Sequence, residues 1–222
     1  MAQQRPHAPG LGMTSARTRA RMVAGLRERG IADERVLAVM AELPRHRFVD
    51  EALASRAYEE TALPIGFGQT LSQPWEVARM TEAVLAFEPE RVLDVGAGSG
   101  YQSAVLAGLV DSVWAAELNP EIAGRTRTLL RQMGVANVHL RVGDGRDAWA
   151  HKAPFDAAVM AASAEEPPLA ILEQIREGGC LVGPLETGEE QRLMCWKRTP
   201  EGLAAADLGN CHFVPLRDRE EP

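Results

Sequence analysis

The sequence predicts an α/β fold: a mostly parallel, doubly wound sheet with an antiparallel hairpin at its C-terminal end and a helical cap at its N-terminal end. Two patterns predict it. From residue 91 onwards, short apolar runs alternate with segments of helical spacing, as in repeated βαβ units, which form parallel sheets with helices on both faces. The last part then shows the strand-like runs LVGPL, RLMCWKR and GNCHFVPL, and sheets of this class often end in an antiparallel hairpin.

The length of 222 residues favours one domain of ordinary size, large enough to bury a core without covalent staples. We expect a disordered tail over residues 1–16, because Pro, Gly, Gln and Ser dominate there and little apolar surface can offset the ordering entropy. We expect a single domain over residues 17–222. Residues 17–90 would supply the helical cap and a long loop, and residues 91–222 the α/β core.

The cap should contain two helices. The first begins at Arg17, carries apolar residues at helical spacing and ends at Gly30. The second follows Asp33, which is placed to cap it, and ends before Pro44.

Residues 44–74 have mixed charge and no sustained period, so the sequence predicts a long, structured loop. Loops of this length inside a compact domain are usually functional. Pro74 suits the first turn of the next helix, so Ser72 lies close to a helix N-terminus. Ser72 is therefore either a simple helix cap or part of a site.

The rest of the core is expected to hold strands at 112–117, 138–142 and 155–160, and helices at 120–133 and 169–176, the last ended by Gly178–Gly179. The third strand of the core leads into VGDGRD, which contains Asp144. At the carboxyl edge of a parallel sheet Asp144 could contact a ligand, although Asp-Gly is also a common turn.

The core begins with RVLDVGAGSGY at residues 91–101, an apolar strand that runs into Gly96, Gly98 and Gly100. A glycine turn between a strand and a helix can aim backbone N–H groups at a ligand. The dinucleotide fingerprint G-x-G-x-x-G needs its third glycine where Tyr101 stands, so binding of NAD is disfavoured.

Two acidic residues near this turn favour a different ligand. Asp94 stands just before the glycines, and Glu117 follows the next strand, 21 residues after Gly96. Together these features resemble a Rossmann-like, class I methyltransferase that binds S-adenosylmethionine, with Glu117 placed to accept hydrogen bonds from the ribose hydroxyls. The alternative is a glycine turn that binds no ligand.

The composition of the chain disfavours several classes of partner and site. The 24 basic and 31 acidic residues give a net charge of −7, which disfavours a nucleic-acid partner. The three cysteines, Cys180, Cys195 and Cys211, lack C-x-x-C spacing and indicate buried thiols rather than a disulfide framework or a metal site. No apolar run is long enough for a membrane span and no signal-peptide pattern occurs, so we expect no membrane partner and a cytoplasmic location.

Longer stretches resemble one enzyme family. YEETALPIGFGQTLSQPWEVARMT at 58–81 and DVGAGSGYQSAVLA are similar to the protein-L-isoaspartate (D-aspartate) O-methyltransferase family, in which G-x-G-Q-T-x-S-x-P is a specific motif. The resemblance extends from about Arg35 to Leu216 and includes PRHRFV, GDG, PFDAAV, CLVGP and QRLMCWK. It implies methyl transfer from S-adenosylmethionine, with S-adenosylhomocysteine as product, to isoaspartyl or D-aspartyl residues of damaged proteins. We expect a monomer.

The resemblance also assigns residues. Ser72 matches the active-site serine of the family. The residues matched to cofactor binding are Gln69, Thr70, Leu71, Gly96, Gly98, Ser99, Glu117, Leu118, Asp144 and Gly145. No metal ligand is implied. The sequence departs from the family pattern on the substrate side, where MAASAEEPP carries Met160 and Glu166, FVD replaces FVP, and Glu76 stands where an apolar residue is common.

The chemistry of methyl transfer agrees with this interpretation. The substrate carboxylate, with a pKa near ~4, is already ionised at pH 7. Its reaction therefore requires correct positioning and no general base. Two alternatives stay open: a methyltransferase for ordinary aspartate in one dedicated peptide, and a catalytically retired module that only binds S-adenosylmethionine.

Overall fold

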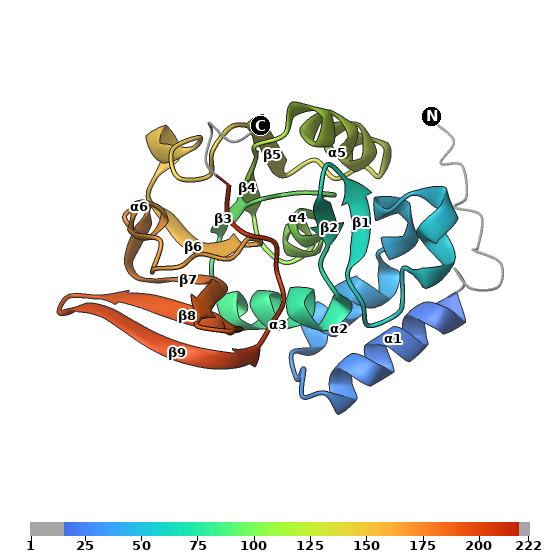
Figure 1. Cartoon of the computed structure of the whole chain (residues 1–222), viewed down its shortest axis with the longest axis horizontal. Helices are drawn as coiled ribbons and strands as arrows, with labels where there is room; N and C mark the ends of the chain where they lie inside the picture. Colours follow the sequence, from blue (N-terminus) through green and yellow to red (C-terminus); the bar gives the residue numbers. More distant parts are fainter. Residues whose placement is uncertain (1–15, 218–222) are drawn as a thin grey trace.

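The computed structural model describes residues 16–217 and builds them around a seven-stranded sheet of order β5-β4-β3-β6-β7-β8-β9 (Figure 1). Its strands are β3 (Arg91–Val95), β4 (Ser112–Glu117), β5 (Val138–Val142), β6 (Phe155–Met160), β7 (Ile175–Thr187), β8 (Glu190–Thr199) and β9 (Gly202–Asn210). β3 to β7 pair in parallel, whereas β8 and β9 add an antiparallel end. This confirms the predicted fold class.

The α-helices are α1 (Ala16–Glu28), α2 (Glu34–Glu42), α3 (Pro74–Leu85), α4 (Tyr101–Ala107), α5 (Pro120–Gln132) and α6 (Leu169–Leu172). The tail expected over residues 1–16 lies outside the described residues, apart from Ala16, which begins α1. The single domain over residues 17–222 stays a prediction. None of the helices in the described part of the chain combines the length and the apolar character needed to cross a membrane.

Alternate residues of the central strands enter two separate cores, because successive side chains of a strand point to opposite faces. Val92 and Val159 belong to the core that includes α3, α4 and the N-terminal helices. Leu93 and Ala158 belong to the core that includes α6. The three cysteines are free and buried, as predicted.

The predicted C-terminal end of one helix is wrong. The helix expected over 169–176 stops at Leu172, and β7 begins at Ile175. Gly178 and Gly179 do not end a helix; they lie in an irregular part of β7, where the register against β6 shifts. A Cβ on Gly179 would lie 2.3 Å from the carbonyl oxygen of Asp156, so these glycines allow a bulge to pack against the neighbouring strand.

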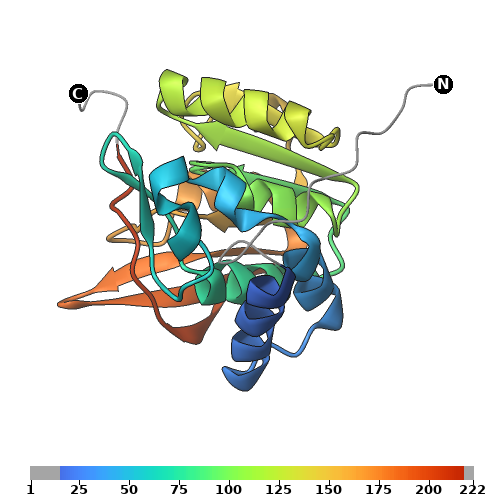
Figure 2. The same ribbon diagram turned by 90° about the vertical axis from the view of Figure 1, so that its right-hand side faces the viewer.

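Residues 44–74 are more regular than the predicted loop. They form the 3₁₀ helices η2 (Arg45–Phe48) and η3 (Glu51–Arg56) and a hairpin of β1 (Leu63–Gly66) and β2 (Gln69–Leu71). These elements are too short to show a period in the sequence. Figure 2 shows the hairpin, in teal, standing apart from the large sheet and beside the C-terminal segment.

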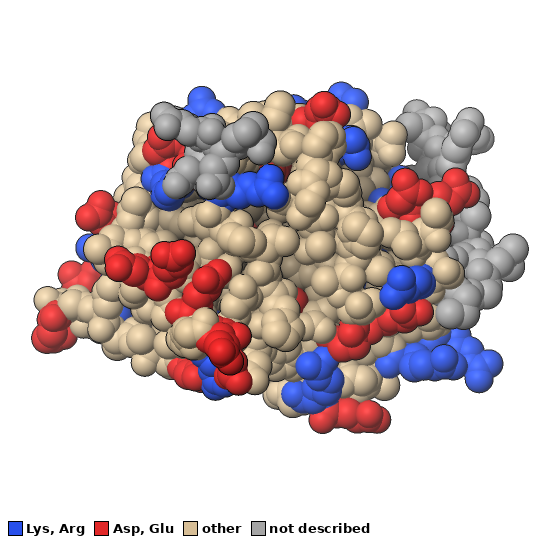
Figure 3. Space-filling model, viewed as in Figure 1, with Lys and Arg blue, Asp and Glu red and all other residues tan. Residues whose placement is uncertain are grey.

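Charged side chains form no single large cluster among the described residues of the face drawn in Figure 3. In the view of Figure 3, uncharged residues cover most of the middle of the face, and Lys, Arg, Asp and Glu lie mainly toward its edges. The basic residues on this face are scattered among acidic ones. This face therefore offers no basic stripe of the kind that tracks a phosphate backbone.

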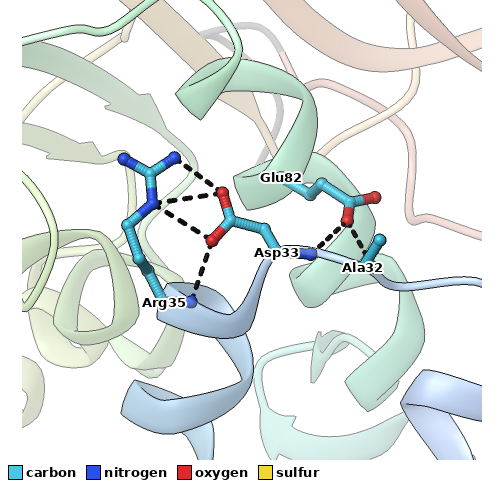
Figure 4. A network of polar contacts seen from close by, with 4 residues as sticks. All are labelled: Ala32, Asp33, Arg35 and Glu82. Carbon is cyan, nitrogen blue, oxygen red and sulfur yellow. Dashed lines mark hydrogen bonds and ion pairs between the residues drawn. The ribbon is translucent and has the colours of Figure 1, made fainter.

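The N-terminal helices are joined to α3 by polar contacts (Figure 4). Asp33 caps α2, as predicted, by accepting a hydrogen bond from the Arg35 N–H at 2.9 Å. The Glu82 carboxylate of α3 accepts hydrogen bonds from the N–H groups of Ala32 and Asp33, at 2.7 and 2.9 Å. The cap thus has a fixed attachment to the helix that follows Ser72.

Candidate active site

The strand order reverses between β3 and β6, and in open α/β sheets ligands bind outside the carboxyl ends of the strands at such a switch point. A cavity of about 320 Å³ lies there. It is lined by every site residue that the sequence suggested: Gln69, Thr70, Leu71, Ser72, Gly96, Gly98, Ser99, Glu117, Leu118, Asp144 and Gly145.

The glycine turn forms the floor of this cavity. Gly96 and Gly98 have φ values of 82° and 52°, in the left-handed region that favours glycine. The N–H groups of Gly96 and Ala97 both bond the Ala116 carbonyl at 2.9 Å, which ties the turn to β4. The turn is therefore held rigidly between two adjacent strands.

Glu117 ends β4 and is 6% exposed. One carboxylate oxygen accepts the Gly98 N–H at 2.8 Å, and the other accepts the Asn119 N–H at 2.8 Å. A carboxylate oxygen has two acceptor positions, so both oxygens keep capacity for hydroxyl groups of a ligand. The backbone therefore fixes the orientation of the Glu117 carboxylate in the cavity.

Asp144 lies in the turn after β5, where the preceding Gly143 N–H bonds the Glu117 carbonyl at 3.0 Å, and both acids line the cavity. It pairs with Arg146, whose Nη2 is 2.5 Å from Oδ2, and accepts the Arg146 backbone N–H at 2.9 Å. A Cβ on Gly145 would lie 2.4 Å from Cγ1 of Val95, so the glycine lets this turn pack directly on β3.

Asp94, the acid before the glycines, does not line the cavity but lies fully buried beneath the turn. The Ser103 hydroxyl donates to Oδ2, and Oδ1 has no partner among the described residues. Burial raises the pKa of Asp94 to about 6, against the effect of the Ser103 hydrogen bond and with a smaller contribution from the negative charge of Glu117. Asp94 therefore supports the turn without contacting a ligand in the cavity.

Ser72 is half-buried in the cavity wall, between β2 and α3. The N-cap of α3 is Gln73, and in the first turn of α3 the Trp75 N–H donates to the Glu60 carboxylate at 2.8 Å rather than to Ser72. The interpretation of Ser72 as a helix cap is therefore wrong. Its presence in the cavity needs a different explanation.

The C-terminal strap, residues 211–217, was not predicted as part of the site. Val214, Pro215, Leu216 and Arg217 line the cavity. Hydrogen bonds of 2.8 Å from the Ser163 N–H to the Val214 carbonyl, and from the Leu216 N–H to the Ser163 carbonyl, hold the strap against the segment after β6. The prediction of a strand over GNCHFVPL is wrong from Cys211 onwards, because β9 covers Gly202–Asn210 and the rest of the motif forms this strap.

Glu76, a departure from the family pattern, has a structural partner in the strap. It is fully buried in the first turn of α3, and its Oε1 accepts the His212 N–H at 2.8 Å and an N–H of the Gln73 side chain at 2.9 Å. Burial raises the pKa of its carboxyl group. Two other residues that differ from the family pattern lie in different environments. Met160 is buried at the end of β6, whereas Glu166 is exposed.

Comparisons with known proteins place this site in a family. The model of the family "Protein-L-isoaspartate(D-aspartate) O-methyltransferase (PCMT)" matches residues 17–221. The chain is 49% identical over 211 residues to the protein-L-isoaspartate O-methyltransferase of Halorhodospira halophila, covering 95% of this chain and 96% of the relative. It is 50% identical over 208 residues to that of Chromohalobacter salexigens, covering 93% and 91%. The chain belongs to this family.

Solved structures agree on the fold. A protein-L-isoaspartate O-methyltransferase structure superposes with a TM-score of 0.81 at 25% identity, covering 90% of this chain and 66% of the other. A Plasmodium falciparum structure described by the same enzyme name, in complex with S-adenosyl-L-homocysteine, superposes with a TM-score of 0.79 at 22% identity, covering 90% and 98%.

The family uses S-adenosylmethionine, and the cavity suits that molecule. Its volume of about 320 Å³ falls within the range of ~300–1,000 Å³ usual for small-molecule sites. The pre-oriented Glu117 carboxylate offers acceptors for two hydroxyls, and the glycine turn leaves room beside it. Among residues 16–217, no group of three or more His, Cys, Asp or Glu side chains is arranged to hold a metal ion.

Proposed function

We propose that this chain transfers the methyl group of S-adenosylmethionine to the free carboxylate of L-isoaspartyl and D-aspartyl residues in damaged proteins, and that Ser72 orients that carboxylate. The observation that carries the proposal is that Ser72 and Glu117, 45 residues apart, line one cavity at the switch point of the sheet. One end of that cavity suits the ribose, and the other offers an uncharged hydroxyl.

When bound, S-adenosylmethionine supplies an electrophilic methyl group on a sulfonium. The substrate carboxylate is ionised at neutral pH, since its pKa lies near ~4, so the protein need not remove a proton. What the chain contributes is alignment, which brings large rate gains when the reacting groups are held close and in line. An uncharged Ser72 suits this task, because a carboxylate at that position would repel the substrate.

The other residues divide by position in the cavity. We assign Gly96, Gly98 and Ser99 to the methionine part of the cofactor. We assign Glu117 with Leu118 to the ribose and adenine, and Asp144 with Gly145 to the adenine edge. The loop residues Gln69, Thr70 and Leu71 would lie between cofactor and substrate.

After transfer, the methyl ester is a better leaving group than the carboxylate. The neighbouring amide nitrogen of the substrate then attacks the ester carbonyl, the C–O bond to the methoxy group breaks and methanol leaves, which closes a succinimide. Water opens this ring spontaneously and partly restores aspartate. These later steps require no enzyme, so the proposed role is the first step of a protein repair reaction.

We further propose that the chain acts as a cytoplasmic monomer and a single domain. We expect neither nucleic acids nor membranes among its partners. The net charge of −7 supports the exclusion of nucleic acid, since phosphate backbones bind basic surfaces.

The test is a methyl-transfer assay with three peptides that differ only in carrying isoaspartyl, aspartyl or asparaginyl at one position. We expect base-labile methyl ester on the isoaspartyl peptide alone, with one S-adenosylhomocysteine formed per ester. Equal methylation of the aspartyl peptide would support an enzyme for ordinary aspartate. Cofactor binding without methylation of any peptide would identify a retired binding module and overturn the proposal.

A further inference from the structure

Arg45, in η2 of the N-terminal cap, is fully buried. Its Nε donates to the Ala57 carbonyl at 2.7 Å, and its Nη2 donates to the Ser72 carbonyl at 2.6 Å. The guanidinium carbon lies 4.7 Å from the ring centre of Tyr101, the first residue of α4. Arg45 thus contacts both the residue proposed as catalytic and the helix that leaves the glycine turn.

Among the described residues this guanidinium is buried without a direct ion-pair partner, and the Glu60 carboxylate acts on it only at longer range. Among the ion pairs of the described residues none involves Arg45, and its Nη1 has no hydrogen-bond partner there. Burial accordingly lowers the pKa of Arg45. Arg35 of the same cap shows the ordinary arrangement: it is exposed and pairs with Asp33 at 2.6 Å (Figure 4). Burying a charge without an ion-pair partner costs folding free energy. An apolar side chain in the place of Arg45 would avoid this cost.

Another type of side chain at position 45 could not make all the contacts of Arg45. The Ser72 carbonyl precedes Gln73 and Pro74, where the chain turns into α3. A lysine could not donate to two carbonyls from one planar fork while stacking on an aromatic ring. The Tyr101 ring is itself fully buried, with Phe48 packed edge-on at a centroid distance of 5.2 Å. The guanidinium therefore links two rigidly packed elements.

We propose that Arg45 is a positioning residue that sets the place of Ser72 relative to the glycine turn, and so aligns the substrate carboxylate for methyl transfer. The inference rests on the proposed function of Ser72. Arg45 acts through the backbone of Ser72 and touches no reacting atom. Its loss should therefore change turnover far more than it changes cofactor binding.

The experiment combines Arg45→Lys with Ser72→Ala in a double-mutant cycle. Turnover of the isoaspartyl peptide is measured at saturating cofactor, and cofactor affinity by calorimetry. Arg19→Lys is the matched control, because Arg19 in α1 also donates from Nε to a backbone carbonyl of the cap, that of Ala41 at 2.9 Å, without contacting Ser72. Thermal unfolding of each variant allows turnover to be expressed per folded molecule.

We expect Arg45→Lys to lower kcat about 10-fold with a change in cofactor Kd below about twofold, since misplacement by a fraction of an ångström suffices to slow an aligned reaction. In the Ser72→Ala background the same change should lower kcat less than about twofold, because its route of action is already gone. Arg19→Lys should leave kcat unchanged. As a second variant, Arg45→Met removes the buried charge and should also lower kcat, whatever its effect on unfolding temperature.

Each contrary result has a definite meaning. Equal losses of kcat from Arg45→Lys in the parent and in Ser72→Ala would overturn the positioning role and leave the proposed function intact. Parent-like turnover in both Arg45 variants would do the same. If the parent itself fails to methylate the isoaspartyl peptide, the proposed function fails, and the inference about Arg45 fails with it.

Discussion

Two groups of residues line the cavity, which we call the cofactor end (Glu117, Asp144 and the glycine turn) and the serine end (Ser72), and they are built in different ways. At the cofactor end, Glu117, Asp144 and the glycine turn follow the carboxyl ends of the adjacent strands β4, β5 and β3. At the serine end, the Ser72 carbonyl accepts a hydrogen bond from Arg45 of η2, and Glu76 of α3 accepts one from His212 of the C-terminal strap, so segments far apart in the chain meet there. The first end is a property of the sheet, and the second depends on tertiary packing.

The ends also differ in charge. Carboxylates at the cofactor end are held by backbone N–H groups, as with Glu117, or by an arginine, as with Asp144. The serine end presents a neutral hydroxyl, and the guanidinium of Arg45 lies buried behind the Ser72 backbone. This difference suits an end that holds polar groups of a cofactor and an end that receives an anionic substrate. Substitutions should therefore affect binding at one end and turnover at the other.

Ser72→Ala is expected to have the largest effect. If the hydroxyl orients the substrate carboxylate, turnover falls by about 10- to 1,000-fold while cofactor affinity barely moves. Because Ser72 caps no helix, the free energy of unfolding should stay within about 0.5 kcal/mol of the parent. Steady-state assays at saturating cofactor and denaturant unfolding measure the two quantities.

Ser72→Thr serves as its companion, since threonine keeps a hydroxyl but adds a methyl group that would crowd the peptide. We expect it to keep the fold and lose much of the activity. Parent-like turnover in both variants would show that Ser72 has no catalytic role and that its loop only shapes the cavity.

Asp94→Asn should show the next largest effect, on stability rather than activity. Burial raises the folded-state pKa of Asp94 from 3.8 to about 6, so the folded state binds the proton more tightly than the unfolded state. Its ionisation therefore costs stability progressively as pH rises from about 4 to 6, reaching about 3 kcal/mol at pH 7. The stability of Asp94→Asn relative to the parent should rise by about that amount over this window.

Asp156→Asn is the matched control for that pH series. Although burial opposes it, hydrogen bonds from Arg176 and from the N–H groups of Arg91 and Glu90 lower the pKa of Asp156. Its stabilising contribution is present above the unfolded-state pKa and is lost as pH falls, the opposite sign to Asp94. Denaturant unfolding between pH 3.5 and 7 compares the two, and parallel pH profiles would contradict the assignment.

Glu117→Ala should weaken S-adenosylmethionine binding by about 1.5–3 kcal/mol, since two hydroxyls would lose charged acceptors. It would also leave the N–H groups of Gly98 and Asn119 without their acceptor. Calorimetry measures the affinity, and Glu121→Ala, an exposed acid in the first turn of α5, should change it little. Unchanged affinity in Glu117→Ala would mean that another group reads the ribose.

The sequence allowed the cofactor end to be predicted because its determinants are contiguous. A buried strand, a glycine turn and an acid one strand later are local patterns, and β3, β4 and β5 were expected at the right places. The Asp33 cap is similarly local.

The errors and omissions have a common physical cause. Gly178 and Gly179 permit a bulge beside β6, but a glycine pair alone cannot show whether it ends a helix or bends a strand. The contact between Glu76 and His212 joins residues 136 positions apart, and no local pattern encodes it. Arg45 lies in the motif PRHRFV, and no local pattern there shows that its guanidinium is buried.

Gly145→Ala is expected to have the smallest effect, and it tests whether the cofactor end depends on close packing of its turns. The added Cβ would lie 2.4 Å from Cγ1 of Val95, so the turn carrying Asp144 must move away from β3. Overpacking of this kind costs about 1–3 kcal/mol of stability and should weaken cofactor binding several-fold. Thermal unfolding and calorimetry measure the two effects.

Two further variants decide whether that cost is steric. Gly124→Ala in α5 places a Cβ where no atom lies within 4 Å, so it should leave cofactor binding unchanged and raise stability by up to about 1 kcal/mol, as Gly to Ala does in a helix interior. A Val95→Ala background removes Cγ1 and Cγ2 and leaves only the contact with the Cβ of residue 95 at 2.9 Å, so Gly145→Ala should cost less than it does in the parent. If its cost is the same in both backgrounds, contact with Val95 is not what holds the turn, and Asp144 is positioned by its own loop rather than by packing on β3.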